Sequence, residues 1–113
     1  MNEEIEKIFE NFIVDELEIP IGFPVYTGKK ETYLTYNTYD EPLQHADDEC
    51  IQCVSNVEIN IFTKGNFINI VKEVKKRMKQ NDYVWTDDSE DLYETDTKYH
   101  HKAISFIKER SAD

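Results

Sequence analysis

The residues that could do chemistry in this 113-residue sequence are two cysteines, three histidines and several clusters of acids. Cys50 and Cys53 form the motif CIQC, whose spacing occurs in redox pairs and in zinc sites. A redox pair of this kind sits at a helix N-terminus, which lowers the thiol pKa. CIQC instead runs into VSNVEINIF, which has the pattern of a strand. A zinc site needs four ligands, and only His45 is close by in the sequence. We therefore expect reduced thiols with no redox or metal role.

The acids and histidines also lack the spacing of a known site. The acid-rich segment 87–96 has neither the sixth-position glycine nor the twelfth-position glutamate of an EF-hand loop. Glu58 stands where metal-dependent nucleases place the glutamate of Glu-x-Lys, but Asn60 occupies the lysine position. His100 and His101 are adjacent, so on a strand they point to opposite faces. We expect a protein that is not an enzyme and needs no cofactor, with a divergent nuclease as a weaker alternative.

The charge of the chain also narrows the classes of function. The chain carries 24 acids and 13 bases, a formal net charge of −11, and 39% of its residues are hydrophobic. This balance argues against a free-standing nucleic-acid-binding protein, which must neutralise phosphates, although a lysine-rich helix keeps such a module as an alternative. No apolar run reaches the length of about 20 residues that a membrane span needs. The acidic N-terminus does not resemble a signal peptide. A single cytoplasmic domain over residues 1–113 is the expectation.

The first half of the chain predicts one helix and two strands. Asn2 can cap a helix in which four apolar residues recur at helical spacing, and this helix should end before Pro20. A short strand is expected at 25–26 and a longer one at 32–39. The polar segment 40–49, which contains Pro42, is expected to be an exposed connection. The four apolar positions of the helix are Ile5, Ile8, Phe9 and Phe12.

The second half predicts a strand, a helix and two further strands. The strand at 50–62 alternates a buried face against a wet one, and Asn66 can cap the helix that follows. Strands are then expected at 81–88 and 99–109. The expected fold is α+β, a mostly antiparallel sheet with two helices in the order α-β-β-β-α-β-β. The expected buried face of the strand comprises Ser55, Val57, Ile59 and Ile61, and that of the helix comprises Phe67, Ile70, Val71, Val74 and Met78.

The strand ETYLTYNTYDE raises a separate question, because it is aromatic on both faces. Strict alternation points Tyr33 and Tyr39 to one side and Tyr36 to the other. Either both faces are covered within the domain, or one face meets another protein.

The order of phrases resembles a known family of phage proteins. PVYTGKKETYLTYNTYDE, VEINIFTKGNFINIVKEVKKRMK and DLYETDTKYHHKAISF, spanning about Pro24 to Phe106, are similar to the tail terminator (tail-completion) proteins of siphophages and prophages. The resemblance implies a fold like that of the lambda tail terminator and a ring, expected to be a hexamer. Such a ring caps the finished tail tube and joins it to the head. Other head–tail connector or neck proteins of the same virion remain alternatives.

The resemblance also implies partners and a location. The partners would be copies of the chain itself, the tail tube protein and a head-completion or connector protein, with DNA only as passing cargo and no membrane. The protein would be assembled in the host cytoplasm and would lie at the head-proximal end of the virion tail. Candidate interface residues are aromatic, basic and acidic: Tyr33, Tyr36 and Tyr39; Lys72, Lys75, Lys76 and Lys79; and Asp47, Asp48, Glu49, Asp87 and Asp88.

Overall fold

The computed structural model describes the whole chain except residues 1, 24, 47–48, 90 and 112–113, with residues 2, 42–52 and 110–111 described by their backbone alone. It contains two helices, a two-stranded hairpin and a mixed, mostly antiparallel six-stranded sheet. The expected α+β class is therefore confirmed. The helices are α1 (Asn2–Ile8) and α2 (Ile68–Gln80). The strands are β1 (Ile13–Val14), β2 (Leu17–Glu18), β3 (Ile21–Gly22), β4 (Tyr33–Ala46), β5 (Glu49–Thr63), β6 (Val84–Asp88), β7 (Leu92–Tyr93) and β8 (His100–Ser111).

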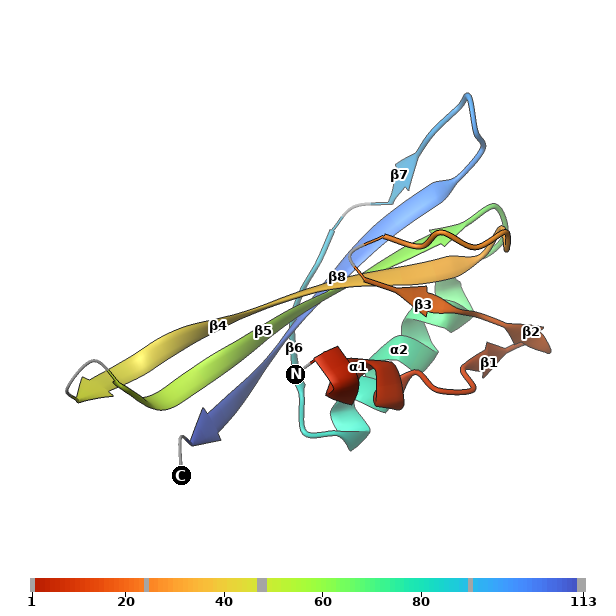
Figure 1. Ribbon diagram of the computed structural model, residues 1–113. Coiled ribbons are helices and arrows are strands. Elements are labelled where there is room, and N and C mark those ends of the chain that lie inside the picture. The colour runs from red at the N-terminus through yellow and green to blue at the C-terminus, as the bar shows by residue number, and fades with distance from the viewer. Residues whose placement is uncertain (1, 24, 47–48, 90, 112–113) are drawn as a thin grey trace.

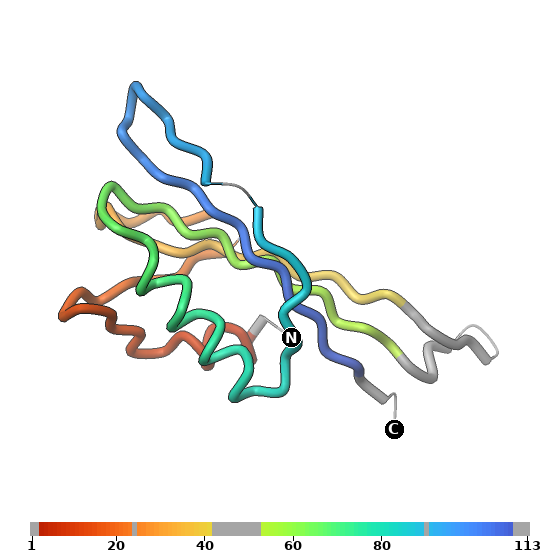
Figure 2. Tube along the Cα trace, turned by 180° about the vertical axis from the view of Figure 1, so that it is seen from behind, coloured from red at the N-terminus to blue at the C-terminus, as the bar shows by residue number. Residues whose placement is uncertain are grey.

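Three long strands form the centre of the sheet. The strand order is β3-β4-β5-β8-β6, and β7 pairs with β8 beyond the end of β6. Among the strand pairs of the described residues, β3–β4 alone is parallel. Both helices lie on one side of the sheet, and the far half of the β4–β5 hairpin projects beyond them (Figure 1). The molecule is elongated, with extents of 51 × 27 × 24 Å, and the opposite view shows α1 and α2 side by side on one face of the sheet (Figure 2).

The core lies between the sheet and the two helices. The β5 residues Val57, Ile59 and Ile61 and the α2 residues Val74 and Met78 are fully or almost fully buried there. The predicted apolar sides of β5 and α2 are thus confirmed as buried. An element with one apolar side shows that side as alternation in a strand and as a stripe in a helix. Within the described residues, no helix has the length and apolar character to cross a bilayer.

The N-terminal helix is shorter than expected. α1 ends at Ile8, although Phe9 and Phe12 continue its apolar spacing and are both buried. The chain turns at Asn11, which has a positive φ of 53°, and then forms the β1–β2 hairpin. The two phenylalanine rings meet edge to face, with centroids 5.2 Å apart. The helix does end before Pro20, but the expectation that it includes Phe9 and Phe12 is wrong, because both aromatic rings reach the core from the turn that follows Ile8.

Two further expectations for the first half are corrected. The short strand, β3, lies at 21–22 rather than at 25–26. It pairs with β4 at Leu34 and Thr35. A side chain at Gly22 would meet the backbone of Val25 and Tyr26 at 2.5–2.8 Å, so this glycine allows the following loop to fold back on the strand. The expectation of an exposed connection over 40–49 is wrong for 40–46, because β4 continues through Pro42 to Ala46 and pairs with β5, while residues 47–48 lie outside the described residues.

The β4–β5 hairpin contains two register shifts that matter for the cysteines. Gln52 pairs with Gln44 and Cys50 pairs with His45, so residue 51 is an extra residue in β5. A regular strand would point positions 50 and 53 to opposite faces, and this extra residue interrupts that alternation between them. Cys53 is disulfide-bonded, which corrects the expectation of reduced thiols. The one other cysteine of the sequence is Cys50, whose side chain lies outside the described residues.

Candidate interaction surfaces

The three tyrosines of β4 have three different environments. Tyr36 points toward the helices and is 0% exposed. Its hydroxyl donates a hydrogen bond to Glu6 Oε1 at 3.2 Å, which ties β4 to α1. Tyr36 was a candidate interface residue, but its side chain is part of the subunit core and is not accessible to a neighbour.

Burial of Tyr36 makes its ionisation a test of this packing. Burial, followed by the charge and hydrogen bond of Glu6, raises the pKa of Tyr36 to about 12 from an ordinary value of 10.0. The unfolded chain releases the proton near pH 10 while the folded chain keeps it, so the stabilising effect is complete below pH 10 and is lost as the pH rises toward 12. We expect the urea midpoint to fall more steeply over pH 10–12 for the wild type than for Tyr36→Phe. Tyr39→Phe, which removes an exposed hydroxyl, should behave like the wild type. Equal slopes for wild type and Tyr36→Phe would contradict the assignment.

Tyr33 lies on the opposite face of the sheet and is covered within the subunit. Its ring stacks between Tyr26, at 4.7 Å, and Phe62, at 5.0 Å, and Phe62 in turn stacks on His101 at 4.4 Å. Burial, together with the nearby Tyr99, raises the pKa of the Tyr33 phenol. This ladder of rings covers one end of the face that the helices leave open, and β5 is not uniformly wet there.

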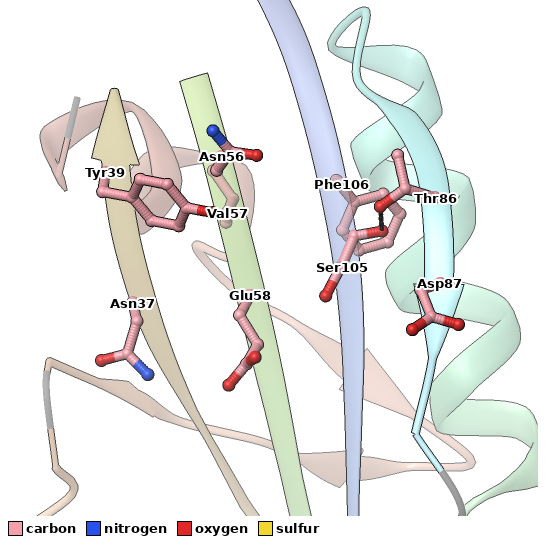
Figure 3. Close-up of a pocket in the computed structure, with 9 residues that line it drawn as sticks. All are labelled: Asn37, Tyr39, Asn56, Val57, Glu58, Thr86, Asp87, Ser105 and Phe106. Carbon is pink, nitrogen blue, oxygen red and sulfur yellow. Dashed lines mark hydrogen bonds between the residues drawn. The ribbon is translucent and has the colours of Figure 1, made fainter. Parts of the chain in front are cut away.

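Tyr39 is the tyrosine of β4 that remains at the surface, with 61% of its area exposed. Its ring is turned toward β5 beside a hollow of about 350 Å³ on the open face (Figure 3). The hollow is also lined by Asn37 from β4, Glu58 from β5, Ser105 from β8 and Asp87 from β6. Four neighbouring strands thus contribute polar side chains to one shallow surface.

The sheet register places these residues in two straight rows. Asn37, Glu58, Ser105 and Asp87 are successive cross-strand partners from one edge of the sheet to the other. The adjacent row on the same face is Tyr39, Asn56, Ile107 and Val84. Tyr39 and Val84 therefore stand at opposite edges of the sheet on the same face, and each is 61% exposed.

The β6–β7 edge carries an unusual share of exposed apolar side chains. Val84 and Trp85 of β6 and Leu92 and Tyr93 of β7 are all more than half exposed. Both strands pair with β8 along the same border of the sheet. Large apolar side chains gathered along one border are typical of a surface that another protein covers.

A register shift at Thr86 builds a charged cluster beside this edge. Trp85 and Asp88 would face opposite ways in a regular strand, but the extra residue puts both on the helix side. Trp85 Nε1 donates to Asp88 Oδ1 at 2.6 Å, Lys75 Nζ lies 3.0 Å from Asp88 Oδ2, and the same ammonium stands 4.4 Å from the centre of the Trp85 ring. Lys75 and Asp88, a basic and an acidic interface candidate from the sequence, are thus paired within one subunit.

The other bases of α2 divide into two groups. Lys72, Lys76 and Lys79 are exposed. Arg77 is not part of that surface, because its guanidinium donates to the backbone oxygens of Ile8 and Glu10 at 2.8 and 3.0 Å. Arg77 thus anchors the end of α1, a role that its place in a run of bases did not indicate.

The remaining sequence candidates are dispersed. Asp47 and Asp48 lie outside the described residues, and so does the side chain of Glu49. His100 Nδ1 lies 2.9 Å from Asp91 Oδ2, whereas His101 Nε2 lies 3.2 Å from the side-chain oxygen of Asn60.

The neighbourhood of Glu58 bears on the nuclease hypothesis. Asn60, at the position where such a nuclease has its lysine, is held by His101. Around Glu58 and elsewhere in the described part of the chain, no three histidine, cysteine or acidic side chains gather as metal ligands would. The site that the geometry does assemble is a set of surfaces at the open face and edges of the sheet.

Comparison with known proteins adds no assignment: no family model matches this chain, and no curated protein matches it.

Proposed function

We propose that this protein is a phage tail terminator: a subunit that assembles into a ring, caps the tail tube and joins it to the head. The sequence resemblance suggests the class, and one structural observation supports it most strongly. The two edges of the helix-backed sheet carry different exposed apolar groups, Tyr39 at one edge and Val84 with Trp85 at the other. A cyclic ring is built by joining one patch of each subunit to a different patch of the next.

The chemistry of these surfaces suits protein contacts. Tyrosine and tryptophan bury large apolar rings while keeping a polar group available, and they are enriched at the centres of protein interfaces. The lysines beside Trp85 and the acids of the sheet face can set orientation and association rate. The proposed location is the head-proximal end of the virion tail, with assembly in the host cytoplasm. The proposed partners are the tail tube protein and a head-completion or connector protein, and DNA would only pass through the ring.

The decisive experiment is negative-stain microscopy of the purified protein at high concentration, combined with sedimentation. We expect rings with a central hole and a mass six times the 13.4 kDa of one chain. Rings that bind one end of purified tail tubes would identify a terminator, whereas rings that bind only the head connector would identify a neck protein. A monomer at all concentrations would contradict the proposal.

The same preparation tests the two other classes of function. A nucleic-acid-binding module would bind DNA with an affinity that falls steeply as salt increases. A nuclease would cleave DNA in magnesium, and Glu58→Gln would abolish the cleavage. If the protein forms no ring and shows DNA binding or DNA cleavage of this kind, that function replaces the terminator proposal.

A further inference from the structure

We propose that neighbouring copies join by strand pairing, with the outer edge of β6 in one copy against the outer edge of β4 in the next. The partner is thus a second copy of this chain. The inference rests on the proposed function only for closure into a ring, since the pairing itself could also build an open filament.

Both edges are available in the described structure. β6 ends the strand order and pairs on one side only, with β8. β3 pairs with β4 only at Leu34 and Thr35, so within the described residues no strand lies along the outer edge of β4 around Tyr39. An edge strand exposes a row of backbone donors and acceptors that can pair with another chain. Pro42, which cannot donate to a ladder, limits the useful part of β4 to a stretch comparable with the five residues of β6.

The strand directions fit this pairing. β4, β5, β8 and β6 are antiparallel in turn, so β6 runs opposite to β4. A second copy related by rotation about an axis along the strands therefore presents its β4 antiparallel to β6 of the first. The sheet continues across the contact with the same alternation that it has inside the subunit.

The side chains at the two edges also match face by face. Tyr39 and Val84 end the same cross-strand row on the open face, so a continued sheet brings these two exposed apolar groups to the same side of the joint. Opposed aromatic and β-branched residues are among the favourable cross-strand pairs of antiparallel sheets.

Charges on the other face are complementary. Asp40 is exposed and lies on the helix side of β4, where it accepts a hydrogen bond from Ser55 Oγ at 2.9 Å. On the helix side of β6, Lys75, Lys79 and Trp85 line an apolar hollow of about 390 Å³. Since Lys75 is already paired with Asp88, pairing the edges brings Asp40 of one copy toward Lys79 of the next. Pairing two β4 edges or two β6 edges would instead bring two Asp40 carboxylates or two Lys79 ammonium groups together.

Two single substitutions test the pairing. Tyr39→Glu places a carboxylate at the β4 edge, and Val84→Glu places one at the β6 edge. Because both wild-type side chains are largely exposed, each variant should keep the melting temperature of the wild type. Each variant alone should assemble at least about tenfold more weakly than the wild type, since every contact uses one altered edge. Ile13→Glu, at a 57% exposed apolar position on β1, is the matched control and should assemble normally.

Mixing the two variants gives the sharpest result. The intact β6 edge of the Tyr39→Glu chain can still bind the intact β4 edge of the Val84→Glu chain, so the mixture should form 1:1 pairs with twice the mass of one chain and nothing larger. Sedimentation of the separate and mixed proteins measures this directly. Dimers of either variant alone would indicate pairing of identical edges and overturn the proposal.

The outcomes separate this inference from the proposed function. Rings that form normally from both variants overturn edge pairing and leave the terminator proposal standing. Open filaments of the wild type that both substitutions dissolve support edge pairing and count against the ring. A wild-type protein that remains monomeric at high concentration overturns both.

Discussion

Replacing Arg77 with alanine is expected to lower the free energy of unfolding by about 2 kcal/mol, because one guanidinium holds the end of α1 against α2. Its Nη1 donates to the oxygens of Ile8 and Glu10, its Nη2 donates to the oxygen of Asn11 at 3.3 Å, and its centre lies 4.9 Å from the centre of the Phe12 ring. The carbonyls at the end of a helix have no partner within the helix, so a cation that binds them both satisfies and neutralises that end. Urea unfolding at neutral pH measures the loss.

Two controls define the origin of the effect. Arg77→Lys keeps the charge but loses the planar fork that reaches several oxygens at once, and it should cost roughly half as much. Lys76→Ala removes a neighbouring exposed base and should change stability by less than about 0.5 kcal/mol. If Arg77→Ala and Lys76→Ala have equal effects, the contacts to α1 do not stabilise the fold.

The role of Arg77 shows a limit of reasoning from sequence. The run of bases on α2 groups Arg77 with the exposed lysines, whereas its side chain is half-buried against the end of α1. The oxygens that it binds are 66–69 residues earlier in the chain. They lie at the end of α1 and in the turn after it, a segment whose apolar spacing is that of a helix. Phe9 and Phe12 keep the spacing of a helix, and only the positive φ at Asn11, Asp15 and Glu16 shows where the chain leaves it.

Regular elements were predictable because their periodicity reports which side is buried. β5 alternates as expected along Ser55, Val57, Ile59 and Ile61, and the stripe of α2 points into the core. Asn66 does not occupy the cap position itself, yet its side chain accepts the amide hydrogen of Ile68 at 2.9 Å and so satisfies the first turn.

Irregular strands were not predictable, since a single extra residue exchanges the faces of everything beyond it. The extra residue Thr86 is what brings Trp85 and Asp88 together with Lys75, and the sequence alone suggests that Trp85 and Asp88 point apart. The tyrosines of β4 show a related limit. Alternation separates Tyr36 from Tyr33 and Tyr39, but it cannot show that the loop residue Tyr26 covers Tyr33 and leaves Tyr39 exposed.

Reversing the charge of Lys72 and Lys76 together is expected to weaken ring formation by about tenfold at low salt, which corresponds to about 1.4 kcal/mol in the association free energy. Both side chains are exposed on α2, so the melting temperature of the subunit should not change. The loss should shrink as salt is added, because exposed charges further apart than about 8 Å are screened at physiological ionic strength. Sedimentation across a salt series measures the assembly midpoint.

The effect of net charge on assembly must be separated from the effect of where the charges lie. Each subunit already carries a formal charge of −11, and the double reversal makes it −15. Lys29→Glu with Lys30→Glu changes the net charge equally at two exposed positions in the loop before β4, so it reports general repulsion. If Lys72 and Lys76 contact the neighbouring subunit, the α2 variant should assemble more weakly than this control at every low salt concentration. Lys75→Glu should differ from both of these variants, because it breaks contacts within the subunit, to Asp88 and Trp85. It should therefore lower the melting temperature of the unassembled subunit. If the α2 variant and the Lys29–Lys30 control assemble equally well, the lysines of α2 serve as solvated surface and the neighbour docks elsewhere.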